Sequence, residues 1–155
     1  MSSKLTRILL VTDHVEPTPA VLDALCERTV RGPVDVRVIV PNPAAAEWHP
    51  LHPERHVKAA EAVQALARTL PIVEASCGVQ AEGFVAMAHD PMDAIEQSLR
   101  EDRYDEIMVA MAQHGGLTRR LHLDLPHRLA HLHVPTTVIE DARHPSAPTR
   151  TASGR

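Results

Sequence analysis

Short runs of apolar residues recur along this chain, separated by longer stretches in which apolar and polar residues mix. Residues 5–12 (LTRILLVT) form a nearly continuous apolar run, which is typical of a strand covered on both faces. Residues 34–40 (VDVRVIV) are rich in β-branched side chains and indicate a second strand. Further strands are predicted at residues 83–88, 105–111 and 136–140.

Helix-start and helix-stop residues flank the stretches between these runs. Thr18 is a candidate N-cap, Pro19 follows at the first helical position, and Gly32 is the expected stop of that helix. Asp90 is expected to cap a later helix that has Pro91 in its first turn. The sequence therefore marks the beginning of both helices.

A long amphipathic helix is predicted over residues 54–70, and Pro71 is expected to end it. Its apolar stripe is expected to consist of Val57, Ala60, Val63, Leu66 and Leu70. A short helix is predicted at residues 125–132.

Strands and helices thus alternate along the chain, which predicts one α/β domain with a parallel sheet and helices on both faces. The domain is expected to span residues 1–141. Residues 142–155 are polar and cannot bury apolar surface, so a disordered tail is expected there. Ligands of such sheets bind at the carboxyl ends of the strands, which places Asp13, residues 40–42 and residues 113–118 near one crevice.

Charge and aromatic content exclude some classes of partner. The formal net charge is −4 with histidine neutral, and the chain has one Phe, one Tyr and one Trp. A general nucleic-acid footprint needs a basic face, and base stacking needs exposed rings, so no nucleic-acid partner is expected. No stretch approaches the roughly 20 apolar residues of a membrane span, so no membrane partner is expected either.

The two cysteines, Cys26 and Cys77, are too few for a disulfide framework, and neither belongs to a CxxC motif. Cys26 falls on an apolar helix face and is expected to be a small buried side chain. A reducing cytoplasm is therefore the expected location.

Four motifs in the observed order resemble the universal stress protein family. They are RILLVTD at residues 7–13, HDPMDAI at 89–95, DEIMVAMAQHGGLTRRL at 105–121 and HVPTTVI at 133–139. The resemblance implies a Rossmann-like or flavodoxin-like fold of the adenine nucleotide alpha hydrolase type, with strand order 3-2-1-4-5. It also implies a homodimer through the last strand, which begins at Thr136 and ends at Glu140, and ATP binding in one subclass.

The resemblance assigns candidate nucleotide contacts residue by residue. Asp13 would accept a hydrogen bond from adenine or ribose, although the same carboxylate could equally serve a turn. Gly115, Gly116, Thr118 and Arg119 would hold the phosphates, because glycines let the backbone approach an anion closely. ATP is the cofactor that this assignment implies.

Several residues depart from the ATP-binding pattern of the family. Gln113 stands in the first glycine position, and Leu123 and Asp124 replace the later Gly-Ser pair. An Asp at a helix start satisfies the amides that an anion would use. Its charge would also repel a phosphate by about 4 kcal/mol at ~4 Å and an effective dielectric near 20.

The expected function is therefore a non-enzymatic, dimeric binding or regulatory module in a stress response, which does not bind ATP in the usual way. The alternative is an ATP-binding universal stress protein with slow ATP hydrolysis. No GxSxG elbow occurs, and no catalytic residue is assigned. The physiological ligand is left open.

Histidine is unusually frequent, with 11 in the chain. His127 and His131 share one face of the predicted short helix, and imidazoles so placed could bind zinc. His49, His52 and His56 form a second group around a proline-rich segment. No HExxH motif or completing ligand accompanies either group, so solvated histidines are expected and no metal site is assigned.

Overall fold

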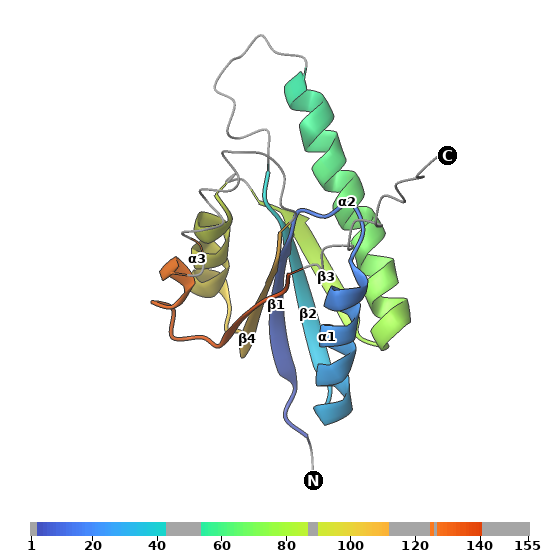
Figure 1. The fold of residues 1–155 in the computed structure, drawn as a ribbon, viewed down its shortest axis with the longest axis vertical. Coiled ribbons are helices and arrows are strands. Elements are labelled where there is room, and N and C mark those ends of the chain that lie inside the picture. Colours follow the sequence, from blue (N-terminus) through green and yellow to red (C-terminus); the bar gives the residue numbers. More distant parts are fainter. Residues whose placement is uncertain (1–2, 43–53, 87–89, 112–124, 126, 141–155) are drawn as a thin grey trace, which may run out of the picture.

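The computed structural model of the 155-residue chain describes residues 3–42, 54–86, 90–111, 125 and 127–140. These residues form a five-stranded sheet in the order β3-β2-β1-β4-β5, and every neighbouring pair is parallel. The strands are β1 (Thr6–Thr12), β2 (Val34–Val40), β3 (Gln80–Val85), β4 (Glu106–Ala110) and β5 (Thr136–Val138). The predicted fold class and strand order are confirmed (Figure 1).

Three helices are described in full: α1 (Pro19–Arg31), α2 (Glu54–Cys77) and α3 (Pro91–Glu101). Both predicted N-caps are confirmed. The Thr18 hydroxyl accepts a hydrogen bond from the Val21 amide at 3.4 Å, and the Asp90 carboxylate accepts one from the Met92 amide at 2.9 Å. Residues 125 and 127–129 are helical, but the predicted end of this short helix at residue 132 is wrong, because residues 130–132 form a turn and a bend.

The prediction that Pro71 ends the long helix is wrong, because α2 continues to Cys77. Proline lacks an amide donor and its ring crowds the carbonyl four residues earlier, so the Ala67 carbonyl is left without its helical partner. Pro71 and Ala67 both lie on the exposed side of α2, where water can hydrate that carbonyl. The helix ends instead at Gly78, which adopts φ +64° and donates to the Glu74 carbonyl at 2.9 Å.

The predicted apolar stripe of this helix is also partly wrong. Val57, Ala60 and Val63 are exposed, because successive steps of three residues drift around the helix by about 60° each. The residues that α2 buries are Ala62, Ala65, Thr69 and Val73. Leu66 and Leu70 pack beside them, as expected.

The two faces of the sheet bury separate cores, and β1 contributes to both. Ile8 and Leu10 join the core under α1 and α2, whereas Leu9 and Val11 join the core under α3. Figure 1 shows α1 and α2 together on one side of the sheet and α3 on the other. This alternation explains why the first strand is a continuous apolar run. Within the described ranges, no helix is both long and apolar enough to cross a membrane.

Candidate functional site

The carboxyl ends of β1 and β4 meet where the strand order reverses, and this is the predicted ligand crevice. Thr12 pairs with Ala110 at this edge, and Asp13 follows Thr12 directly. The buried Thr12 hydroxyl accepts a hydrogen bond from the His14 amide at 3.2 Å, which bends the chain after the strand. Asp13 itself is half-buried and follows the end of β1, the end of the sheet at which fold logic places the ligand crevice.

Asp13 is the one member of the predicted nucleotide set that the structure describes. Gly115, Gly116, Thr118 and Arg119 lie outside the described residues. Gln113, Leu123 and Asp124, which argue against an ordinary phosphate site, lie outside them as well.

The start of α3 lies at the same edge of the sheet, because α3 follows β3. One Asp90 carboxylate oxygen caps the helix, and the other lies 2.9 Å from Arg128 Nη1. The two side chains are 19% and 36% exposed. Sequence reasoning assigned Asp90 only to capping, so it missed this link, which spans 38 positions.

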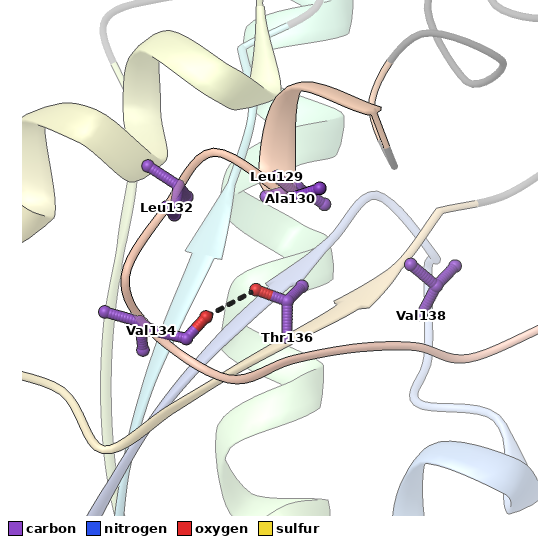
Figure 2. A pocket seen from close by; sticks show the side chains of 6 residues that line it. All are labelled: Leu129, Ala130, Leu132, Val134, Thr136 and Val138. Atoms are coloured by element: carbon purple, nitrogen blue, oxygen red, sulfur yellow. Dashed lines mark hydrogen bonds between the residues drawn. The ribbon is translucent and has the colours of Figure 1, made fainter.

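An apolar groove runs beside β5. It has a volume of about 340 Å³ and is lined by Leu129, Ala130, Leu132, Val134, Thr136 and Val138. Figure 2 shows these side chains around the hollow, with the Thr136 hydroxyl donating to the Val134 carbonyl at 3.1 Å. Val138 remains 45% exposed at its end.

The backbone hydrogen bonds between β4 and β5 determine which backbone groups of β5 face outward. The Ile107 amide donates to the Pro135 carbonyl, and the Ile139 amide donates to the Val109 carbonyl. In a parallel ladder the intervening residues, Thr136 and Val138, then point their amides and carbonyls away from β4. In the part of the chain that the structure describes, no strand pairs with this outer edge.

An ion pair holds β5 and α1 to the central sheet. Arg28 of α1 donates to both carboxylate oxygens of Glu106 on β4, at 2.8 and 3.2 Å. The Thr137 hydroxyl donates to the same carboxylate at 2.9 Å. The hydrogen bond with Glu106 raises the pKa of the Arg28 guanidinium above its ordinary value. The outer strand is therefore fixed by side chains as well as by its short ladder.

A polar cluster lies at the opposite edge of the sheet, near the start of the strands. Arg7 pairs with Asp102, and Arg37 donates to the Tyr104 hydroxyl at 3.3 Å. The Arg103 amide and then Arg7 hold the pKa of Asp102 below its ordinary value, whereas burial raises the pKa of Tyr104. This cluster lies away from the ligand crevice.

The two cysteines form a disulfide, with Cα atoms 4.9 Å apart. The expectation that Cys26 is simply a small buried side chain is therefore wrong. Cys26 lies on α1 and Cys77 is the last residue of α2, and these helices cover the same face of the sheet. Right-handed crossovers place the first two helices side by side, so the fold allows this pairing, but the residue types alone do not indicate it.

The histidine pair has a simple geometry. His127 and His131 are exposed, and their rings meet edge to face with centroids 5.3 Å apart. Among the described residues, no three His, Cys, Asp or Glu side chains converge as a metal site would require. His49 and His52 lie outside the described residues.

No protein-family model matches the chain, and no curated protein sequence matches it. One solved structure with a similar fold is that of a universal stress protein from Archaeoglobus fulgidus. The two are 17% identical, with a TM-score of 0.51, and the alignment covers 87% of this chain and 93% of the other. The likeness is one of fold. It agrees with the fold that the sequence motifs implied.

Proposed function

We propose that this chain is a universal stress protein-like, non-enzymatic module that acts in a stress response as a homodimer. The observation that carries the proposal is the outer edge of β5, which lies beside an apolar groove. The motifs at residues 7–13 and 105–121, together with the fold of the Archaeoglobus fulgidus protein, support the assignment. The proposed site of action is the cytoplasm.

In the proposed dimer, β5 of a second copy pairs with the outward amides and carbonyls of Thr136 and Val138. Such pairing gives hydrogen-bond partners to the backbone groups of the strand edge and makes a symmetric interface. Val138 also adds apolar area, because it is 45% exposed and lines the groove. Ile139 contributes less, since its amide bonds to Val109 and its side chain packs against the core under α1.

Light scattering after size-exclusion chromatography tests the dimer. The wild type is expected to elute with the mass of two chains, and Val138→Lys with the mass of one, because a charge at the groove opposes a second copy. Val30→Lys is the matched control, since Val30 is 87% exposed on α1. It should remain a dimer. A wild type that stays monomeric at high micromolar concentration contradicts the proposal.

The proposed module does not bind ATP in the usual way, because Asp124 stands where the family has a hydroxyl and Gln113 where it has a glycine. A repulsion of about 4 kcal/mol corresponds to roughly three decades of affinity. Calorimetry with Mg-ATP should detect no binding to the wild type and a gain of binding in the Gln113→Gly, Asp124→Ser double variant. Micromolar binding to the wild type would refute this part of the proposal.

The alternative is an ATP-binding protein with slow hydrolysis, and the position of Asp13 favours it. This carboxylate lies half-buried at the carboxyl end of the central strand, where a nucleoside would bind. Under this alternative, Gly115, Gly116, Thr118 and Arg119 hold the phosphates. Wild-type binding that Asp13→Ala abolishes, together with slow release of phosphate, would favour it over the non-nucleotide module.

A further inference from the structure

The Cys26–Cys77 bond joins α1 and α2, two helices that pack on the same face of the sheet. Cys26 is in the third turn of α1, and Cys77 closes the last turn of α2, 51 positions later in the sequence. Both cysteines are half-buried, so a small thiol or disulfide in solution can reach the bond from outside. The described part of the chain holds no other cysteine, and the sequence contains only these two.

The surroundings suit the separated thiols as well as the bond. The Cys26 sulfur lies 3.5 Å from the Ser76 carbonyl oxygen, and the Cys77 sulfur lies 3.5 Å from the Leu22 carbonyl oxygen. A thiol is a weak donor, so each S–H has an acceptor within reach once the bond opens. Reduction therefore leaves neither sulfur without a partner.

We propose that Cys26 and Cys77 form a reversible thiol–disulfide switch that tightens or loosens the α1–α2 layer. The oxidant is a low-molecular-weight disulfide such as oxidised glutathione. One protein thiolate attacks it, forming a mixed disulfide and releasing one small thiolate. The second protein thiolate then attacks the protein sulfur of that mixed disulfide and releases the other small thiol. Two electrons and two protons pass from the dithiol to the oxidant, and excess reduced glutathione reverses both steps.

The physical output of the switch is the stability of one face of the sheet. Closing a loop of 51 positions removes conformational freedom from the unfolded chain. For a domain of this size the oxidised form should melt about 10 °C above the reduced form. In the reduced form α2 keeps its packing on the sheet and the hydrogen bond that the Glu74 carboxylate accepts from the Ala81 amide at 3.2 Å, but it loses the covalent link to α1. Its carboxyl-terminal turns should therefore open more often. The stability of the α1–α2 layer would thus depend on the ratio of oxidised to reduced thiols around the protein.

The experiment equilibrates the full chain in buffers with rising ratios of oxidised to reduced glutathione. Each sample is quenched with acid and treated with a maleimide reagent, and free thiols are counted by intact mass. Thermal unfolding is followed in the same buffers. The expected wild type passes from two alkylated thiols to none, and its melting midpoint rises with the loss of thiols. The Cys26→Ser and Cys77→Ser single variants should each take up one glutathione as a trapped mixed disulfide.

The double Cys26→Ser, Cys77→Ser variant is the matched control. It should melt at the same temperature as the reduced wild type in every buffer. This result would distinguish loss of the bond from loss of folding. The proposal is overturned if the wild type keeps two free thiols in oxidised glutathione. It is equally overturned if the bond survives excess reduced glutathione, since the pair would then be a permanent staple, or if the two states melt at the same temperature.

Discussion

Leu66 on α2 packs directly over the bare backbone of Gly83 on β3. A β-carbon built at Gly83 would lie 2.5 Å from Leu66 Cδ1 and 2.7 Å from the Val38 carbonyl oxygen. The leucine could rotate away, but the Val38 carbonyl is part of the β2 backbone and cannot. Gly83 therefore sets how closely the helix approaches the edge of the sheet.

Gly83→Ala should lower the free energy of unfolding by about 1–3 kcal/mol, the usual cost of overpacking a filled core. Urea unfolding followed by circular dichroism measures it. Adding Leu66→Ala should not restore stability, since the contact with the Val38 carbonyl remains. An alanine variant as stable as the wild type would mean that α2 packs less closely than described.

Thr69 is fully buried on α2, and its hydroxyl has no hydrogen-bond partner among the described residues. Thr69→Val replaces that hydroxyl with a methyl group of similar shape. The variant should be more stable by roughly 1 kcal/mol, because the cost of burying an unsatisfied polar group disappears. Thermal unfolding measures the change under fixed redox conditions.

Thr29→Val is the matched control for this prediction. The Thr29 hydroxyl donates to the Cys26 carbonyl at 2.7 Å, so the same replacement removes a hydrogen bond there. Stability should fall in Thr29→Val and rise in Thr69→Val. Equal effects at the two positions would show that the Thr69 hydroxyl is satisfied in solution.

The architecture could be predicted because its signals are local. The apolar run at residues 5–12 and the caps at Thr18 and Asp90 each need only a few neighbouring residues to be interpreted. Pro71 was misleading because a proline ends a helix or is tolerated in it depending on whether the carbonyl four residues earlier, here that of Ala67, can be hydrated. That depends on the tertiary structure. The Cys26–Cys77 bond and the Asp90–Arg128 pair join residues far apart in sequence, and residue types alone do not indicate such pairings.

The candidate site was predictable only in part, for a related reason. Fold logic places the ligand crevice at the end of the first strand, and Asp13 directly follows that strand. The groove beside β5 was not foreseen as a cavity. It forms between the strand and a segment around Leu129 and Leu132, whose side chains belong to the core under α3.

Arg28→Ala should destabilise the protein by about 1–3 kcal/mol and weaken the attachment of β5. Arg28 and Glu106 are only 19% and 15% exposed, so removing the guanidinium leaves a poorly solvated carboxylate whose one remaining side-chain donor among the described residues is Thr137. Hydrogen exchange of the Ile139 amide, which bonds to Val109, should accelerate along with the loss of stability. Chemical unfolding and exchange mass spectrometry provide the two measurements.

Arg31→Ala is the comparison for this change. Arg31 pairs with Glu27 on the same helix, but the two side chains are 72% and 60% exposed. An exposed pair of this kind contributes at most about 1 kcal/mol, so the midpoint should barely move. If both variants lose the same stability, the Glu106 pair has no special role at β5.

Asp105 should make the protein lose stability on acidification. Its carboxylate accepts a hydrogen bond from the Arg7 amide at 3.0 Å and another from Lys4 at 2.7 Å. These contacts, with the Arg7 amide first, lower its pKa in the folded state. A lowered folded pKa stabilises the fold fully above the unfolded value of about 3.9, and this contribution disappears as the pH falls through the folded value.

Asp105→Asn should therefore be less stable at pH 7 and should show a smaller loss of stability between pH 5 and pH 2, as measured by urea unfolding across that range. Glu61→Gln, an exposed carboxylate on α2, should leave the acid profile of the wild type intact. If Asp105→Asn keeps the wild-type slope, the carboxylate is not held by Arg7 and Lys4 in solution.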